Sequence, residues 1–184
     1  MTAGVLVLVV GPSGAGKDTL INAARERLAA DPRFVFPRRI VTRASTVFED
    51  HGSVSAEQFA HMASTGVFAV HWHAHGLGYA LPREIDGKIA AGGIAVCNVS
   101  RAVIEAARQR YGNVRVFYID ARPDVRAARI AMRGRDAAAG SRVDPGRADS
   151  AREACHVLID NSDRLDTAIA DFMRALSALL PETS

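Results

Sequence analysis

The stretch Val5–Leu20, VLVLVVGPSGAGKDTL, decides the fold. Val5–Val10 is an unbroken run of aliphatic residues, which is typical of a parallel strand covered on both faces. A glycine-rich segment follows, and Asp18–Ala30 then carries apolar residues at helical spacing. In this order of strand, loop and helix, the loop backbone can turn its N–H groups toward phosphate oxygens. The stretch therefore predicts a phosphate-binding P-loop.

The loop is predicted to hold the phosphates of ATP or a close relative. Lys17 is a candidate catalytic residue, because its ammonium group can offset charge that shifts as a phosphoryl group moves. A glycine-rich turn without a ligand is the alternative, but the flanking strand and helix argue against it. The predicted nucleotide-binding residues are Gly11, Pro12, Ser13, Gly14, Ala15, Gly16, Lys17, Asp18 and Thr19.

Position 18 departs from the motif, which has a serine or threonine whose hydroxyl binds Mg²⁺. The carboxylate of Asp18 is a suitable Mg²⁺ ligand. It is equally suited to the start of a helix, where acidic residues are favoured. Thr19 is a second candidate ligand, so the sequence leaves the metal ligand open. ATP and Mg²⁺ are the expected cofactors.

The rest of the chain continues to alternate between strands and helices. Strands are predicted at 39–42, 67–73, 94–99, 114–120 and 157–160, and helices at 56–64, 82–91, 100–111, 123–132 and 164–180. This order predicts an α/β fold of the P-loop NTPase type, a three-layer sandwich with a parallel central sheet. With 184 residues the chain fits a single domain, 1–184.

Composition limits the choice of partner and compartment. The chain has 23 basic and 20 acidic residues, without a basic run interleaved with aromatics, which favours a small anionic molecule over a nucleic acid. No apolar stretch is long enough for a membrane helix, and Val5–Val10 lacks the basic start of a signal peptide. Cys97 and Cys155 are expected to be free thiols in a reducing cytoplasm. A homodimer is compatible with the sequence, which does not decide the oligomeric state.

Basic residues and histidines lie between residues 39 and 82. Arg39, Thr42 and Arg43 stand at the end of a predicted strand, where open α/β sheets bind ligands, although such a strand end is often solvated surface. Three histidines alternate in His71–His75 and would share one face of an extended segment. Binding an anionic acceptor, binding a metal and ordinary packing all remain open for them.

Arg133 and Arg135 flank a glycine at the start of a segment rich in arginine, glycine and alanine. Arginines on a mobile segment opposite a P-loop can close over the transferring phosphoryl group. Both are therefore candidate catalytic residues, on a small lid at about 133–148.

With these motifs, the chain resembles the guanylate kinase group of nucleoside monophosphate kinases over most of its length. The resemblance rests on the P-loop, Thr42-Arg43, the segment 68–82 and Arg133–Arg135. It implies a guanylate-kinase-like fold. The guanine-reading residues of that group are missing, since Val70 stands where its glutamate would be and Thr46 where it has a second phosphate-binding arginine.

The chain is more similar to the ribose 1,5-bisphosphate phosphokinases of phosphonate breakdown. The shared stretches are Gly11–Asp18, Thr42-Arg43 with Glu49 and His51, Trp72–Tyr79, Glu84–Asp86, Asn98–Arg101, Arg133–Arg135, and Cys155-His156 leading to Asp160-Asn161. This resemblance implies transfer of the γ-phosphoryl group of ATP to ribose 1,5-bisphosphate, a small phosphorylated sugar, giving 5-phosphoribosyl 1-diphosphate (PRPP) and ADP. The predicted acceptor-binding residues, within an acceptor region at about 39–82 and just after the 94–99 strand, are Arg39, Thr42, Arg43, His51, His73, Tyr79, Ser100 and Arg101.

Two other functions remain open at this point. One is a nucleoside monophosphate kinase, such as a guanylate kinase, with unusual base recognition. The other is a non-catalytic nucleotide-binding module, against which Lys17 and the Arg133–Arg135 segment argue.

Overall fold

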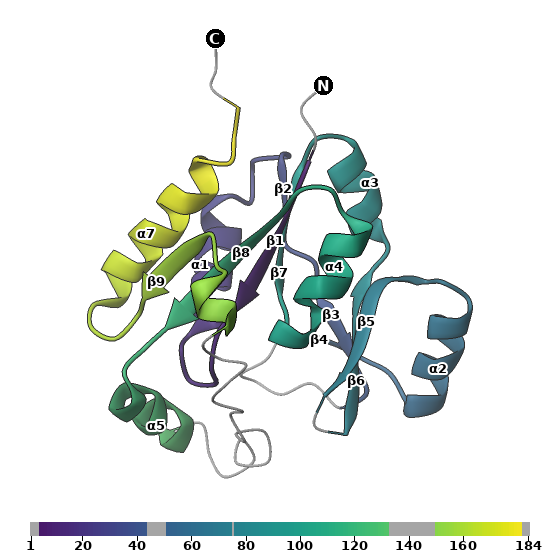
Figure 1. Ribbon diagram of the computed structural model, residues 1–184, viewed down its shortest axis with the longest axis horizontal. Coiled ribbons are helices and arrows are strands. Elements are labelled where there is room, and N and C mark those ends of the chain that lie inside the picture. The colour runs from purple at the N-terminus through teal and green to yellow at the C-terminus, as the bar shows by residue number, and fades with distance from the viewer. Residues whose placement is uncertain (1–3, 44–50, 75, 133–149, 182–184) are drawn as a thin grey trace.

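The computed structural model describes residues 4–43, 51–74, 76–132 and 150–181. These residues form two β-sheets with helices packed around them (Figure 1). The larger sheet has the strand order β2-β7-β1-β8-β9, and the smaller one has the order β4-β3-β6-β5.

The larger sheet confirms the predicted parallel core. All its neighbouring strands pair in parallel, and β1 lies in the middle. Every residue of β1 is buried, as its unbroken apolar sequence predicts. The strands are β1 (Val5–Val10), β2 (Phe34–Val35), β7 (Ile94–Asn98), β8 (Val114–Asp120) and β9 (Val157–Asp160).

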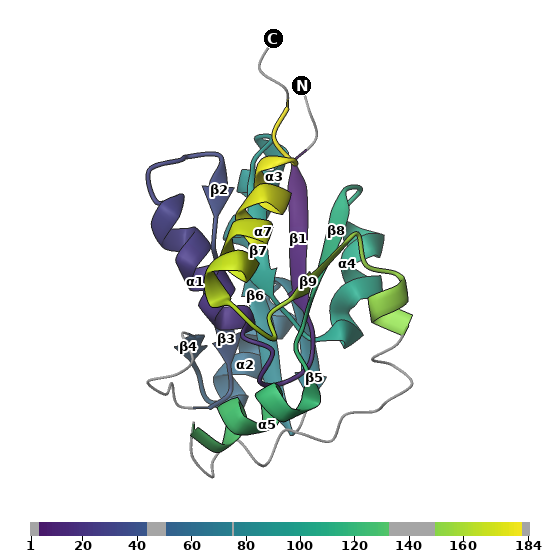
Figure 2. The same ribbon diagram turned by 90° about the vertical axis from the view of Figure 1, so that its left-hand side faces the viewer.

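Helices cover both faces of this sheet, which gives the expected three layers (Figures 1 and 2). α1 (Lys17–Arg27) and α7 (Leu165–Ser177) pack on one face, in an apolar cluster with alternate residues of β1. α3 (Glu84–Ala90), η1 (Arg101–Val103) and α4 (Ile104–Arg110) pack on the other face with the remaining β1 residues. Because successive side chains of a strand point to opposite faces of the sheet, the residues of β1 contribute alternately to two apolar cores.

The smaller sheet is mixed and was not predicted as a separate unit. β3 pairs in parallel with β4 and antiparallel with β6, which is also antiparallel to β5. The predicted strands at 39–42 and 67–73 belong here and not to the parallel sheet. Its strands are β3 (Arg39–Val41), β4 (His51–Ser53), β5 (Phe68–Ala74) and β6 (Leu77–Pro82).

Two further helices, α2 (Ala56–Ser64) and α5 (Pro123–Met132), pack near the smaller sheet and the P-loop. α2 begins with a capping box, in which Ser55 and Gln58 bond reciprocally, and it packs Phe59 against the smaller sheet. α5 follows β8 and lies against the loop between β1 and α1. Within the described ranges, no helix has the length and apolar character needed to cross a membrane.

Candidate active site

The P-loop conformation depends on its glycines. The loop joins the end of β1 to the first residue of α1, Lys17. Gly11, Gly14 and Gly16 have φ angles of 142°, 79° and 90°, a region that other residues rarely adopt. A Cβ at Gly11 would also lie 2.0 Å from the carbonyl oxygen of Ile119. The backbone therefore passes so close to β8 that only glycine fits.

The ammonium group of Lys17 lies over the first part of this loop. Its Nζ donates to the carbonyl oxygens of Gly11 and Pro12, at 2.8 and 2.9 Å. Most other loop residues are buried, whereas Ser13 and Thr19 are exposed. The loop thus carries one cation at the position where a phosphate group would meet the N-terminus of α1.

Asp18 points to the end of a neighbouring strand. Asn98, the last residue of β7, donates from Nδ2 to Asp18 Oδ1 at 2.6 Å. α1 has no side-chain hydrogen bond at its N-cap, Gly16, so Asp18 is a first-turn acidic residue and not the cap itself. Within the described residues, no group of three or more His, Cys, Asp or Glu side chains could hold a metal by itself. One carboxylate suits Mg²⁺, which usually keeps waters and binds substrate phosphates as well.

Arg39 reaches the same place from the smaller sheet. It lines a cavity of about 20 Å³ together with Asp18, Asn22 and Asn98. Burial lowers the pKa of the Arg39 guanidinium, and the negative charge of Asp18 opposes this effect. Arg39 and Asp18 therefore interact electrostatically, although they are 21 positions apart in the sequence.

The two faces of the smaller sheet separate the predicted acceptor residues. Val41 pairs with Tyr79, so Arg39 and Tyr79 share one face, where Tyr79 stacks on Trp72 with ring centroids 5.5 Å apart. His73 lies on the opposite face, with its ring 5.7 Å from that of Phe59 in α2. The structure thus brings Arg39 and Tyr79 together and does not bring His73 to them.

The histidine pattern is only partly described. His71 and His73 are both exposed and both contact Phe59, which agrees with the predicted shared face. His75 lies outside the described residues. The backbone of His51 pairs with Arg39 in β4, and the position of its side chain is not described.

The other predicted acceptor residues lie at strand ends. The Thr42 hydroxyl accepts a hydrogen bond from the backbone N–H of Gly78, which extends the pairing of β3 with β6. Arg43 follows directly and interacts electrostatically with Arg39. The Ser100 hydroxyl accepts a bond from the backbone of η1. Arg101 has a buried Nη1 atom without a hydrogen-bond partner in the described part of the chain.

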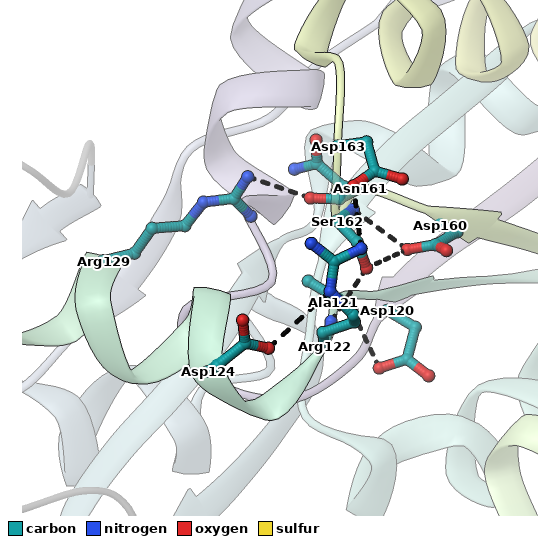
Figure 3. A network of polar contacts seen from close by, with 9 residues as sticks. All are labelled: Asp120, Ala121, Arg122, Asp124, Arg129, Asp160, Asn161, Ser162 and Asp163. Atoms are coloured by element: carbon teal, nitrogen blue, oxygen red, sulfur yellow. Dashed lines mark hydrogen bonds and ion pairs between the residues drawn. The ribbon is translucent and has the colours of Figure 1, made fainter.

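Three residues that were not predicted as site residues contact the P-loop. Arg129 donates to the carbonyl oxygen of Asn161 at 2.9 Å (Figure 3). It also donates to the carbonyl oxygen of Gly14 at 3.4 Å. Asn161 in turn donates from Nδ2 to the carbonyl oxygen of Ala15 at 2.8 Å. Arg126 precedes Arg129 by three positions, and its Cα lies 3.1 Å from where a Cβ on Gly14 would be. Only two features of the sequence pointed to these contacts. Arg126 and Arg129 are spaced so that they lie on one face of a helix, and Asn161 directly follows a predicted strand.

A polar network joins the ends of β8 and β9 beside the loop (Figure 3). Asp160 accepts hydrogen bonds from the backbone and the hydroxyl of Ser162. The Ser162 hydroxyl accepts from the backbone N–H of Arg122 at 2.8 Å, and Arg122 pairs with Asp163 at 2.7 Å. The network fixes the start of α5 relative to the end of β9.

A pocket of about 390 Å³ lies between this network and the P-loop. The Nε of Arg126 is buried and has no hydrogen-bond partner among the described residues. The lining is rich in arginine and includes a P-loop residue, so the pocket suits a phosphorylated ligand. Its lining residues are Pro12, Tyr118, Asp120, Ala121, Arg122, Pro123, Arg126, Arg152, Leu158, Asp160 and Ser162.

The predicted catalytic arginines cannot be placed. Arg133, Arg135 and the predicted lid at 133–148 lie outside the described residues. The last residue of α5, Met132, is described and is 85% exposed.

Comparison with known proteins agrees with this architecture. The chain is similar to the solved guanylate kinase of Anaplasma phagocytophilum, with a TM-score of 0.68 and 21% sequence identity, over 96% of this chain and 86% of that one. At this identity the similarity concerns the fold. The protein therefore has a guanylate-kinase-like α/β fold that carries a P-loop, as predicted.

Curated relatives narrow the class to one family, although no family model matches the chain. Proteins named ribose 1,5-bisphosphate phosphokinase PhnN include one from Brucella melitensis, 43% identical over 98% of this chain and 95% of the relative. One from Acidiphilium cryptum is 44% identical over 95% of this chain and 93% of the relative. One from Rhodopseudomonas palustris is 56% identical over 72% of this chain and 68% of the relative. The chain belongs to the ribose 1,5-bisphosphate phosphokinase family. This confirms the resemblance inferred from its motifs.

Proposed function

We propose that this protein transfers the γ-phosphoryl group of ATP to the 1-phosphate of ribose 1,5-bisphosphate, giving PRPP and ADP in phosphonate catabolism. The observation that carries the proposal is identity of 43% to a curated phosphokinase of that name along nearly the whole of both chains. An intact P-loop with its lysine supports the same chemistry.

The donor side consists of Gly11–Thr19 and the adjoining pocket. The loop N–H groups and Lys17 would bind the phosphates, and the pocket of about 390 Å³ that shares Pro12 with the loop would take other parts of the nucleotide. Mg²⁺, held by ATP phosphates together with Asp18 or Thr19, would supply further charge neutralisation. Arg129 and Asn161 would keep the loop in its binding conformation through their bonds to Gly14 and Ala15.

The acceptor side lies where the smaller sheet meets the end of β7. Arg39, Arg43, Tyr79 and Arg101 provide cationic and hydroxyl groups for a sugar that carries two phosphates. An oxygen of the acceptor 1-phosphate attacks the γ-phosphorus while the bond from that phosphorus to the ADP oxygen breaks. Because the attacking oxygen is already ionised, the step needs positioning and charge compensation and no strong general base.

We also propose roles for the parts that the structure leaves undescribed. Arg133 and Arg135 would close over the transferring phosphoryl group from a lid at about 133–148. Residues 39–82 would form the acceptor-binding part of one kinase domain that spans 1–184. ATP and a small phosphorylated sugar are metabolites of the cytoplasm, which we propose as the location of the protein.

Acceptor choice tests the proposal directly. Purified protein is supplied with ATP and Mg²⁺, and ADP release is followed with ribose 1,5-bisphosphate, ribose 5-phosphate, GMP or AMP as the acceptor. We expect turnover with the bisphosphate at least about a hundredfold above that with any nucleotide, because a site built for a substrate's polar groups rejects ligands that lack them. Turnover with GMP and none with ribose 1,5-bisphosphate would show a nucleoside monophosphate kinase instead.

A further inference from the structure

Arg39 is a cation without a direct side-chain partner among the described residues. It is partly buried, and burial lowers its pKa, yet it forms no side-chain hydrogen bond or ion pair with another described residue. The negative charge of Asp18 stabilises this guanidinium group, and the positive charge of Arg43 opposes it. Burying a guanidinium group without a partner is costly, so its position indicates a negative group nearby that is not in direct contact.

Among the described residues that line the cavity beside Arg39, Asp18 is the only carboxylate, and its orientation is fixed. The bond from Asn98 at 2.6 Å holds one carboxylate oxygen against the end of β7. Asp18 and Arg39 both line the cavity of about 20 Å³, which is large enough for one water molecule. A water in this cavity can hydrogen-bond to both side chains and so transmit the influence of one charge on the other.

The charge of Asp18 is otherwise hard to explain in a P-loop. A serine or threonine at this position is neutral, whereas a carboxylate repels the phosphates that the loop binds. A nearby arginine compensates for that charge. Two arginines line the cavity with Asp18, namely Arg25 of α1 and Arg39 of β3. The charge of Asp18 acts on Arg39, which lies on the face of the smaller sheet that also carries Tyr79.

We propose that Asp18 is a positioning residue for the acceptor, which orients Arg39 through a water in the cavity between them and so couples the donor loop to the acceptor site. This inference rests on the proposed function. It assigns to Asp18 a role other than direct Mg²⁺ ligation. Arg39 is then oriented before an acceptor phosphate arrives, and it binds that phosphate without losing rotamer freedom at that step.

A double-mutant cycle on acceptor KM tests the coupling. The variants are Asp18→Ser, which restores the usual P-loop residue, Arg39→Gln, and the two combined. We expect each single variant to raise the KM for ribose 1,5-bisphosphate about tenfold, as the loss of a charge-assisted hydrogen bond does. The double variant should be no worse than the poorer single one, because both lose the same oriented guanidinium. Additive effects, or a lower KM in Asp18→Ser, would overturn the proposal.

The Mg²⁺ dependence separates the two roles of Asp18. In Asp18→Ser we expect the Mg²⁺ concentration for half-maximal rate to stay within about twofold of the wild-type value, since the hydroxyl of serine suits Mg²⁺ as well. Asp18→Asn removes only the charge and keeps an oxygen acceptor for Asn98. If Asp18→Asn shifts the Mg²⁺ titration about tenfold and leaves the acceptor KM unchanged, Asp18 is a metal ligand and the positioning role is wrong.

A binding measurement keeps this test independent of catalysis. Calorimetric titration with inorganic pyrophosphate, without Mg²⁺ but with excess ADP to fill the P-loop, should show weaker binding to Asp18→Asn and Arg39→Gln than to the wild type. Equal affinities would contradict the coupling even if the enzyme uses another acceptor. Asp166→Asn is the matched control, because Asp166 is an exposed carboxylate in the first turn of α7, away from the cavity. A wild type that binds pyrophosphate but does not phosphorylate ribose 1,5-bisphosphate would refute only the proposed function.

Discussion

At the scale of single residues, Lys17 and Asp18 are neighbours with different partners. The ammonium of Lys17 bonds to carbonyl oxygens within its own loop, and the carboxylate of Asp18 bonds to a strand that ends 80 positions later. The first contact follows from the local motif and could be predicted. The second depends on how β7 is placed beside β1, which the sequence pattern does not specify.

Lys17→Ala tests the residue on which the donor site depends. We expect kcat to fall by a factor of about 100 to 1,000, because removing one preoriented group that stabilises transition-state charge has this effect. The melting temperature should change little, since Lys17 is only partly buried. The ADP-release assay and a thermal melt provide the measurements, with Lys88→Ala as a control at the other lysine of the chain. Unchanged turnover would contradict every kinase mechanism considered for this loop.

At the scale of elements, sequence reasoning found most strands and missed β2, β4 and β6. β1, β7, β8 and β9 were predicted within one residue, because each is rich in aliphatic, β-branched or aromatic residues. β2 has two residues and β4 has three, too few to show a period. β6 contains Gly78 and ends at Pro82, residues that normally count against a strand. Gly78 is needed there, because a Cβ would lie 2.8 Å from the Phe59 ring.

The shared stretch Glu84–Asp86 shows why a matching motif need not mark a site. Asp86 accepts hydrogen bonds from the Tyr111 hydroxyl at 2.5 Å and from Arg110 at 2.7 Å, so it joins α3 to the end of α4. Burial and this bond raise the pKa of Tyr111 to about 12. The sequence could not distinguish this structural role from substrate binding. The contact of Asn161 with the P-loop was unpredictable for the same reason, since it joins residues 146 positions apart.

The pairing of β8 with the segment before β9 predicts a pH dependence of stability. The backbone N–H of Val116 donates to His156 Nδ1 at 3.0 Å, and burial, with Arg115 and Arg108, lowers the pKa of His156 below its ordinary 6.5. The folded state therefore keeps the imidazole neutral at a pH where the unfolded chain is protonated. The stability that the neutral imidazole of His156 contributes to the folded state is complete above pH 6.5, and it is lost as the pH falls toward the lowered pKa.

His156→Asn isolates this effect, because the asparagine oxygen can accept the same bond but does not titrate. We expect the wild type to lose more thermal stability than His156→Asn when the pH is lowered from about 7.5 to 5.5, by a few degrees in melting temperature. Above about pH 7 the two proteins should have similar pH dependence. A pH dependence that is identical in both proteins over the whole range would exclude His156 as the cause.

At the scale of the whole molecule, the proposed function assigns one substrate to each sheet. The parallel sheet carries the P-loop, and the smaller sheet carries Arg39 and Tyr79. They meet through the apolar cluster that includes Trp72, Leu81 and residues of β7. The parallel sheet was predictable from the order of elements. The second sheet was not, because a sequence that forms a strand does not indicate which other strands it pairs with.

Trp72 offers a reporter for the acceptor side alone. It is the only tryptophan of the chain, and its ring is stacked on Tyr79 at an interplanar angle of 12°. Because Tyr79 shares a sheet face with Arg39, we expect ribose 1,5-bisphosphate to change the intrinsic fluorescence, and ATP alone to leave it nearly constant. The change should disappear in Trp72→Phe. A response to ATP but not to the acceptor would show that the two binding sites are assigned to the wrong sheets.

The central position of β1 has a consequence for how the chain is made. β1 is synthesised before its two partners, β7 at Ile94–Asn98 and β8 at Val114–Tyr118. Until the ribosome has released those segments, a wholly apolar strand has no partner in the parallel sheet, and pairing over such sequence separations is slow. The strand that organises the finished protein is therefore the segment most exposed to aggregation during translation, and the one for which a chaperone has most time to act.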